Sequence, residues 1–476
     1  MGNSQNYIIG GSGDCGNSSL TNGGMYAIKD APYTGAWADL MAANGGPIYN
    51  YKELTTFDGS VTITRTSGDF TNAAVGMFVY VYLITDEVGA WVQIDGVDAI
   101  DQAYIEVMSL DAYDAQDVEV RVGGAWPANH TGIQQALDVI VAGETIEICC
   151  NQDTGTTMII GAALNTNVAN DGGPSDLLQM KGVDSADGTD LDSTSKYPVL
   201  QASANMASIL QTQSQFWRIG RLHFDGNGKT FTVAGVQATD TLNSFYNCLC
   251  SNVVGKDGFY SHSVGNVFAD CEAWDCGRFG FYCDTYGDSL ISCSAHECGS
   301  NGINMYGGYG SGVINCRAYH NTGSGIVVRS YGGVCAGNVA DANTACGFYF
   351  TSWPYMTAVY NNSATNNIEQ GYFAQTSTVK SFAMFAGNHS YGNSAHSNMC
   401  ADGAWADLFG GGNITGDPLF RGDETDGDYR LQAGSPLLNA GWPQTWGYET
   451  DQDAISIFNT IGVPSTKQMF NLIGGN

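Results

Sequence analysis

One pattern repeats within residues 257–305, DGFYSHSVGNVFADCEAWDCGRFGFYCDTYGDSLISCSAHECGSNGINM. Each repeat contains a glycine followed by an aromatic or aliphatic residue, and 22 residues separate Gly258 from Gly280 and Gly280 from Gly302. The glycine recurs at spacings of 22 to 24 residues, at Gly235, Gly258, Gly280, Gly302, Gly325, Gly347 and Gly371. This period predicts a solenoid whose repeats stack on their neighbours. A leucine-rich repeat has a similar length but needs periodic Leu and Asn, which are absent.

Two strands in each repeat are predicted to face the solenoid core. The residues one position after the glycine are all apolar: Val236, Phe259, Phe281, Ile303, Ile326, Phe348 and Tyr372. Those three positions after it are Ala238, Ser261, Cys283, Met305, Val328, Phe350 and Ala374, and a two-residue alternation is what one buried strand face requires. A second strand is indicated seven positions before the glycine by Ala273, Ala295, Ala318, Ala340 and Ala364. The predicted fold is an all-β, right-handed parallel β-helix with coils of 22 to 24 residues.

Cysteine and asparagine form further columns at the repeat period. Cys271, Cys293 and Cys316 lie nine positions before the glycine, where parallel side chains suit a disulfide poorly. We interpret them as small buried apolar residues, with a redox or metal site as the alternative. Cys276 and Cys298 start a second column, which Asn321, Asn343 and Asn367 continue as a predicted asparagine turn ladder.

The rest of the chain predicts four regions: an N-terminal attachment arm at 1–57, a small β-barrel or sandwich at 58–122, the β-helix at 123–445 and a tail at 446–476. Strand-like runs in the second region cover 60–65, 77–84, 91–94 and 103–107. After the junction Gly-Gly-Ala-Trp-Pro at 123–127, apolar residues at helical spacing predict a helix that caps the β-helix. They are Ile133, Ala136, Leu137 and Ile140, with Thr131 as a possible N-cap.

Charge and missing motifs exclude several function classes. The 476 residues contain 17 Lys and Arg against 47 Asp and Glu, a formal net charge of −30 that disfavours nucleic acid and anionic membranes as partners. The N-terminus lacks the basic and apolar regions of a secretory signal, so we expect the chain to stay where it is made. Phosphate-binding loops, GxSxG, HExxH and paired CxxC motifs are also absent from the sequence.

The coil sequence, with FDGNG at 224–228 and DPLF and DYRLQAGSPLLNAG between 417 and 441, resembles the pectate-lyase-like right-handed β-helix superfamily. Members of this superfamily include secreted polysaccharide-active enzymes, bacterial surface proteins and phage virion proteins. The order of β module, junction, cap helix and solenoid looks like phage spikes, fibres or decoration proteins. The resemblance therefore implies a structural or adhesive protein at the virion surface, with an extracellular location as the alternative. Its expected partners are virion proteins, bound through the N-terminal region, host surface polysaccharide and further copies in a homotrimer.

A polysaccharide lyase or glycoside hydrolase is the rival hypothesis, and a bacterial surface protein is a third. Five positions before the glycine, successive coils place Asp275, Glu297 and His320, so two carboxylates about 5 Å apart could act as acid and base. The other interpretation is a solvated acidic surface, because adjacent coils bring any two outward residues to this distance. No cluster of calcium-binding carboxylates with a catalytic arginine, as in pectate lyases, is evident.

Outward positions of the repeat predict a face that binds glycan or a protein partner. Two and four positions after the glycine, the outward residues include Tyr260, His262, Tyr282, Asp284, Tyr306, Arg329, Tyr349 and Phe373. Aromatic rings beside hydrogen-bonding groups suit carbohydrate, since rings stack on apolar sugar faces while polar groups bind hydroxyls. The same surface suits a trimer or capsid interface. No cofactor is expected, although Asp423, Asp426 and Asp428 surround a glycine turn that could bind calcium.

Overall fold

The computed structural model describes the strands between Asn6 and Ile160, the helical residues His130, Ile133, Gln134 and Leu137, and most of the chain after them. The later described ranges are 161–166, 171–184, 191, 196–307, 309–351, 357–375, 382–399, 412–421 and 428–438. The chain divides into two compact units, 1–200 with 219–222, and 201–218 with 223–476. Within the described residues no helix is long and apolar enough to cross a membrane.

The first unit contains a closed antiparallel barrel with the strand order β2-β3-β6-β5-β4-β7. Its strands are β2 (Leu54–Phe57), β3 (Thr62–Arg65), β4 (Phe78–Leu83), β5 (Val88–Ala99), β6 (Gln102–Glu106) and β7 (Gln116–Val122). The barrel begins four residues before the boundary predicted at residue 58, because β2 pairs with both β3 and β7 and closes the barrel. The sequence gives little sign of β2, whose LTTF lacks a regular alternation of apolar and polar residues.

The first unit also holds parallel strands, in which β1 (Asn6–Gly10) pairs with β8 (Ala125–Pro127) and β9 (Thr145–Cys150), and β9 with β12 (Leu178–Asp184). Ile133 and Leu137 of the predicted cap helix have helical backbone and are fully buried. Thr131, Ala136 and Ile140 lie outside the described residues, as does the predicted tail at 446–476. Further strands in this part of the chain are β10 (Thr157–Ile160), β11 (Leu164–Asn165), β13 (Val199–Ala202) and β15 (Trp217–Gly220).

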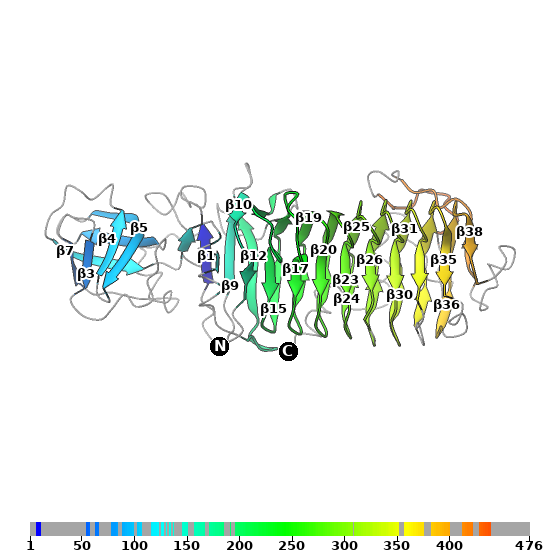
Figure 1. The fold of residues 1–476 in the computed structure, drawn as a ribbon, viewed down its shortest axis with the longest axis horizontal. Coiled ribbons are helices and arrows are strands. Elements are labelled where there is room, and N and C mark those ends of the chain that lie inside the picture. Colours follow the sequence, from blue (N-terminus) through cyan, green and yellow to red (C-terminus); the bar gives the residue numbers. More distant parts are fainter. Residues whose placement is uncertain are drawn as a thin grey trace. The chain divides into compact units, whose positions relative to one another are not determined.

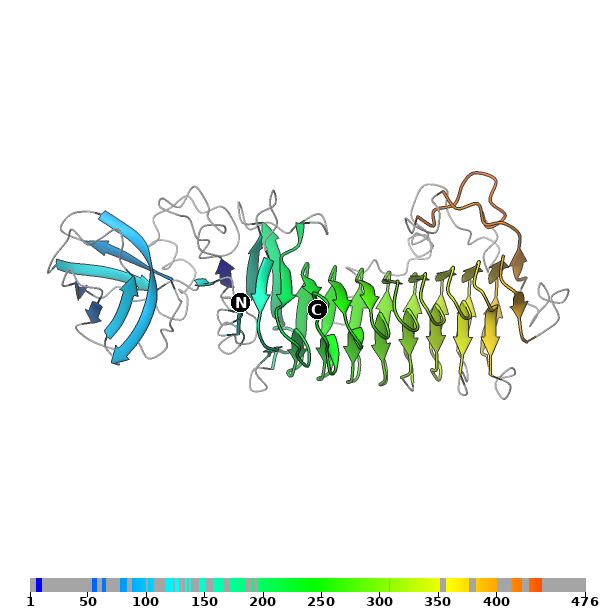
Figure 2. The same cartoon turned by 45° about the horizontal axis from the view of Figure 1, so that its top comes forward.

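The second unit is a parallel β-helix in which each rung, one turn of the solenoid, contributes a strand to each of three sheets (Figures 1 and 2). The first sheet contains β18 (Ser244–Tyr246), β21 (Val267–Ala269), β24 (Ser289–Ile291), β27 (Gly312–Ile314), β30 (Val334–Ala336), β33 (Ala358–Tyr360) and β36 (Met384–Ala386). The second contains β16 (His223–Asp225), β19 (Leu249–Val253), β22 (Glu272–Cys276), β25 (Ser294–His296), β28 (Arg317–Tyr319), β31 (Val339–Asp341), β34 (Ser363–Thr365), β37 (His389–Tyr391) and β39 (Ile414–Thr415). The third contains β14 (Leu210–Thr212), β17 (Ala234–Ala238), β20 (Asp257–Ser261), β23 (Phe281–Cys283), β26 (Ile303–Met305), β29 (Ile326–Val328), β32 (Phe348–Phe350), β35 (Gln370–Ala374) and β38 (Ala395–Ser397).

The predicted register of the coils is confirmed in the third sheet. Phe259 pairs with Phe281, and Ile303 pairs with both Phe281 and Ile326. These inward side chains are at most 1% exposed, and the rings of Phe259 and Phe281 stack 5.0 Å apart. Ala273 and its equivalents are likewise buried in the second sheet. The first sheet contributes a third inward column that the sequence analysis did not identify: Phe245, Phe268, Leu290, Val313, Cys335, Val359 and Phe385.

The repeated glycine is required by the closeness of successive rungs. A Cβ atom on Gly280 would lie 2.7 Å from the Ala295 Cβ and 2.9 Å from the Gly302 carbonyl oxygen. Contacts this short are essentially absent from proteins, so a side chain there would push two rungs apart. The period that identifies the fold in the sequence therefore has a packing cause.

The predicted asparagine ladder is confirmed by its hydrogen bonds. The Cys298 backbone N–H donates to the Asn321 Oδ1 atom over 3.1 Å, and the Asn321 N–H donates to Asn343 Oδ1 over 3.1 Å. Asn343 bonds Asn367 in the same way. A second ladder runs through Asn338, Asn362 and Asn388. Because these side chains satisfy buried backbone donors at the corners, they hold the rungs together where strand pairing stops.

Cys271, Cys293 and Cys316 are free, fully buried thiols, as interpreted from their column. Burial raises their pKa values well above the usual range, so they stay protonated. The Cys271 thiol donates a weak hydrogen bond to the Ala269 carbonyl oxygen at 3.3 Å. A protonated thiol without access to solvent is a poor nucleophile and a poor metal ligand.

The C-terminal segment, residues 412–421 and 428–438, first adds β39 to the end of the second sheet, and its Phe420 and Tyr429 then pack against Tyr319 of that sheet. The Tyr429 ring meets Tyr319 edge to face at 5.7 Å, and its hydroxyl donates to Asp341 Oδ2 at 3.3 Å. The His389 ring nitrogen Nε2 lies 2.7 Å from the Gly416 carbonyl oxygen. The DPLF and DYRLQAGSPLLNAG words thus include residues that cover part of the second sheet.

Candidate functional site

The outer face of the third sheet carries the predicted binding residues. In β20 and β23, Phe259 and Phe281 point into the core, so the strand alternation turns Tyr260 and Tyr282 outward. Just past the strand ends, His262 and Asp284 lie on the same two rungs. The fold therefore brings together four residues that lie up to 24 positions apart in the chain.

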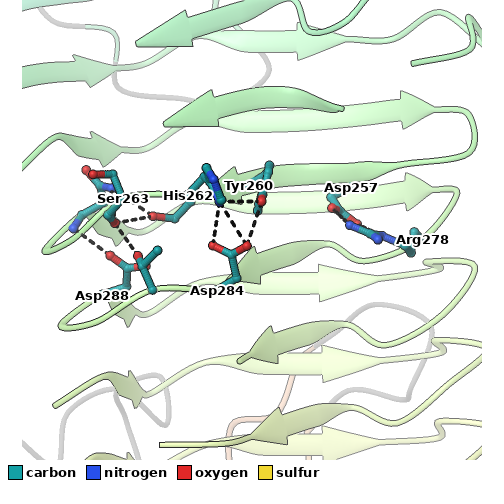
Figure 3. Close-up of polar contacts among 10 residues, drawn as sticks. Asp257, Tyr260, His262, Ser263, Arg278, Asp284 and Asp288 are labelled. Atoms are coloured by element: carbon teal, nitrogen blue, oxygen red, sulfur yellow. Dashed lines mark hydrogen bonds and ion pairs between the residues drawn. The ribbon is translucent and has the colours of Figure 1, made fainter. Parts of the chain in front are cut away.

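Tyr260, His262 and Asp284 form one hydrogen-bonded cluster (Figure 3). The Tyr260 hydroxyl donates to Asp284 Oδ2 at 2.8 Å and also lies 2.8 Å from His262 Nδ1. The His262 Nδ1 atom is 3.1 Å from Asp284 Oδ1. The single hydroxyl proton of Tyr260 is used in its hydrogen bond to Asp284. The contact between His262 Nδ1 and Asp284 Oδ1 is then a hydrogen bond if Nδ1 carries the imidazole proton. The imidazole side chain remains 59% exposed, so the rest of the ring faces solvent.

Burial and the hydrogen bond to Asp284 raise the pKa of Tyr260 well above its usual range. Burial also raises the pKa of Tyr282, and the Asp284 charge adds to this effect. Both phenols therefore stay protonated at neutral pH and act as hydrogen-bond donors. A phenol of this kind donates hydrogen bonds but gives up its proton less readily than an ordinary tyrosine.

A buried ion pair borders the cluster on the same two rungs (Figure 3). The Arg278 guanidinium donates from Nε to Asp257 Oδ1 at 2.6 Å and from Nη2 to Asp257 Oδ2. The Asp257 side chain is fully buried, while that of Arg278 is 38% exposed. The guanidinium carbon also lies 5.0 Å from the centre of the Tyr282 ring and 4.7 Å from that of Phe279. This bidentate pair fixes Arg278 beside the rings, with donors still accessible to solvent.

The other predicted residues lie on the following rungs. Tyr306 is 44% exposed, and the Arg329 guanidinium carbon lies 4.3 Å above the centre of its ring. Tyr349 and Phe373 are adjacent, with ring centres 5.1 Å apart. In the outward column, Asn304 and Val327 lie between the Tyr260 and Tyr282 pair and the Tyr349 and Phe373 pair. These two side chains are only 6% and 3% exposed. The aromatic column is therefore interrupted rather than continuous.

The rings do not present free faces along the whole column. Tyr260 and Tyr282 stack on each other at 5.2 Å with an interplanar angle of 9°, and Arg278 lies over the second ring. Stacking between these rungs occupies ring faces that a sugar could otherwise contact. What the face offers are phenol hydroxyls, ring edges, a carboxylate, an imidazole and a guanidinium.

Asp275, Glu297 and His320 occupy equivalent corners on consecutive rungs, as the repeat predicts. Their φ angles are 49°, 55° and 53°, in the left-handed region where each chain turns from the second sheet towards the third. Glu297 lies 3.8 Å from His296 Nδ1, and among the described residues no hydrogen bond joins the three predicted side chains. Their alignment on consecutive rungs therefore follows from the repeat of this corner along the solenoid.

We expect the Asp275→Asn and Glu297→Gln variants to keep both the fold and the function of the protein. Both side chains are exposed, and surface substitutions usually change stability by less than about 0.5 kcal/mol. The measurements are the thermal midpoint and whichever glycan-binding or glycan-cleaving activity the protein shows. Loss of activity in either variant without unfolding would move the active centre to this corner.

Of the three residues in the calcium hypothesis, the structure describes only Asp428. Asp423 and Asp426 lie outside the described residues. Both carboxylate oxygens of Asp428 accept hydrogen bonds from Arg430, at 2.7 Å and 2.6 Å, and this partner lowers the Asp428 pKa. Among the described side chains, no group of three or more His, Cys, Asp and Glu could hold a metal ion.

The sequence analysis missed an aromatic column on the second sheet. The Trp274 ring lies 5.2 Å from that of His223 and is parallel to that of His296 at 6.1 Å, and His296 stacks on Tyr319 at 4.7 Å. Glu272 lies 3.2 Å from His296 Nε2. A signal was present, since Trp274, His296 and Tyr319 each come one position after an inward alanine. The Asp257 and Arg278 pair was also missed, because a contact 21 residues apart has no local pattern.

Comparison with known proteins supports the fold. Residues 207–399 match the family model described as a right handed beta helix region. Pectate lyase Pel9A is similar in structure, with 13% identity, a TM-score of 0.44, and coverage of 67% of this chain and 86% of the lyase. The A-module of the mannuronan C-5 epimerase AlgE4 from Azotobacter vinelandii has 14% identity, a TM-score of 0.32 and coverages of 60% and 93%. The Dettilon tailspike protein has 10% identity, a TM-score of 0.35 and coverages of 56% and 59%.

A search of curated proteins finds no match to the sequence. At these identities the structural likeness concerns the fold alone. Unrelated functions share such scaffolds, so the activity has to be argued from the side chains on the rungs. The chain contains a right-handed parallel β-helix.

Proposed function

We propose that the protein is an adhesive surface component of a bacteriophage virion, a spike, fibre or capsid decoration, whose β-helix binds host surface glycan through its third sheet. The observation that carries the glycan site is the Tyr260, His262 and Asp284 cluster beside the Asp257 and Arg278 pair. A sugar hydroxyl both donates and accepts hydrogen bonds. The cluster and the ion pair supply acceptors and donors for it within two rungs. The order of barrel, Gly-Gly-Ala-Trp-Pro junction and solenoid along the chain supports the virion assignment.

The rigidity of the scaffold favours a binding role. Each of the two rungs is held by strand pairing to its neighbours and by stacked rings inside and outside the coil. Side chains fixed in this way lose little conformational entropy when they bind a ligand. The proposal places attachment to other virion proteins in the N-terminal region before the barrel and the mature protein at the virion surface. Detection of the chain in purified phage particles by mass spectrometry tests this location.

We expect Asp284→Asn and Arg329→Ala to weaken binding to a host polysaccharide by at least about tenfold, because hydrogen bonds to charged groups contribute about 1.5–3 kcal/mol. Binding is measured by affinity electrophoresis on a panel of host surface polysaccharides. Asp275→Asn is the matched control, since it makes the same chemical change on a neighbouring face of the same coils. Equal binding by the wild type and the Asp284→Asn and Arg329→Ala variants would place the receptor site elsewhere.

A second candidate function, a polysaccharide lyase or glycoside hydrolase, is favoured by the same cluster for a different reason. Tyr260 is a protonated phenol in hydrogen-bond contact with an imidazole and a carboxylate, which is a possible proton relay. A lyase would release products with an unsaturated sugar end, which absorb ultraviolet light, and a hydrolase would release new reducing ends. Either product, formed by the wild type and lost in Tyr260→Phe with its fold intact, replaces the purely adhesive role with the enzymatic one.

A further inference from the structure

An exposed apolar ridge runs along the corner between the third sheet and the first. It consists of Leu242, Val264, Tyr286, Tyr309 and Tyr331 on five consecutive rungs. The first four are 42%, 44%, 53% and 59% exposed. Large exposed apolar side chains elsewhere in the described residues do not form such a series on consecutive rungs. Contiguous exposed apolar surface on a water-soluble chain usually marks a contact with another molecule.

The ridge is held as a rigid unit. The backbone N–H of Leu242 donates to the Val264 carbonyl oxygen at 3.2 Å, and Gly287 and Gly310 donate to the carbonyl oxygens of Tyr309 and Tyr331 at 2.8 Å and 2.9 Å. The Tyr309 and Tyr331 rings stack at 4.9 Å, and the Tyr286 ring meets Tyr309 at 5.4 Å. The missing Cβ atom of Gly310 would have no neighbour within 4 Å, so another backbone could approach closely there.

The segments that run from this ridge onto the first sheet carry little charge, in contrast to the second sheet. The segments that carry it onto the first sheet, 242–246, 264–269, 286–291, 309–314 and 331–336, contain a single ionisable Asp, Glu, Lys, Arg or His. That residue is Asp288, which is fully buried. The second sheet and its corners, in contrast, expose Glu272, Asp275 and Glu297. An uncharged strip is unusual in a chain with a formal net charge of −30.

From these observations we propose that the ridge is a contact between copies of this chain. Two copies repel each other through their net charge, and the repulsion is strongest where carboxylates face one another within a Debye length of about 8 Å. Within these segments the ridge and the first sheet present no exposed carboxylate to a second copy, and the nearest carboxylates, Asp240 and Asp284, lie at the third-sheet edge of the ridge, two positions before Leu242 and Tyr286. Identical rungs also give both copies the same spacing of about 4.8 Å, so the side chains of one ridge can pack between those of the other. Homo-oligomers commonly close in this symmetric way.

The test is sedimentation velocity of the full chain over a concentration series. We expect the wild type to associate, more strongly at higher salt because salt screens the repulsion between copies. Tyr309→Glu should weaken the association at least about tenfold, because the new carboxylates of two copies would face each other. Tyr391→Glu is the matched control, since Tyr391 is 38% exposed on β37 of the second sheet. It should associate as the wild type does.

Two further measurements keep the result unambiguous. Thermal unfolding should show equal midpoints for the wild type and both glutamate variants, and Tyr286→Ser, which removes a ring without adding charge, should weaken association by a smaller factor. A wild type that stays monomeric at all concentrations overturns the proposal. So does an oligomer that responds equally to Tyr309→Glu and Tyr391→Glu, since the contact would then lie elsewhere.

Discussion

The Ile303→Asp variant should fail to fold into a β-helix. Ile303 is fully buried and pairs with Phe281 on one side and Ile326 on the other, in the column that runs through the core of the third sheet. A carboxylate there has no partner, and it disturbs two neighbouring rungs as well as its own. Burying an unpaired polar or charged group costs several kcal/mol, comparable to the whole stability of about 5–15 kcal/mol of a typical domain.

Circular dichroism and resistance to limited proteolysis measure this outcome. The matched control is Tyr306→Asp, which places the same carboxylate on the same rung at a position that is 44% exposed. The control should retain the β-helix signal and resist proteolysis as the wild type does. Near-native thermal stability of Ile303→Asp would mean that the inward register is wrong.

The sequence predicted the parts of this fold that repeat. Because each rung rests on an equivalent rung, positions such as Ile303 and Ile326 face the same environment and therefore hold the same kind of residue. The same reasoning identified the ladder that starts at Asn321, where buried backbone donors recur at each corner. Because the environment repeats from rung to rung, equivalent positions recur at a fixed spacing in the sequence.

Contacts that occur once in the molecule could not be predicted in this way. Tyr429 reaches Asp341 across 88 residues, and Arg278 pairs with Asp257 on the preceding rung only. Nothing in the local sequence marks these partners. For the candidate site, the repeat placed Tyr260 and Asp284 on one outer face, but their hydrogen bond depends on side-chain directions that a column alignment does not contain.

The first sheet shows a further limit of the pattern. Its inward column includes Phe245, Phe268 and Leu290, which are apolar and lie 12 or 13 positions before the glycines. The strands of this sheet are only three residues long, so each offers a single inward residue and no alternation. A strand of that length is recognised only when its neighbours on other rungs are already aligned.

A buried carboxylate ends another ladder of the solenoid. The Trp217 backbone N–H donates to Asn243 Oδ1, the Asn243 N–H to Asn266 Oδ1, and the Asn266 N–H to Asp288 Oδ1, each at 2.9 Å. Asp288 thus occupies the position that asparagine holds on the two preceding rungs. Burial raises the pKa of Asp288 to about 7, although Asn266, Ser261 and Thr285 oppose the shift by donating hydrogen bonds.

Asp288 should therefore make the β-helix less stable as the pH rises. Its pKa is higher in the folded chain than the value of about 3.9 for an unfolded chain, so between these values the folded state binds more protons and loses stability with increasing pH. The Asp288→Asn variant has no such proton, and its carboxamide can accept from Asn266 as the other ladder members do. We expect it to be more stable than the wild type by up to about 4 kcal/mol near pH 8, and nearly equal to it near pH 4. Urea unfolding of both proteins at the two pH values measures the difference, with the exposed Asp275→Asn as the control that should show no such gain. An Asp288→Asn variant that is no more stable than the wild type near pH 8 would show that the buried carboxylate is compensated in the folded chain.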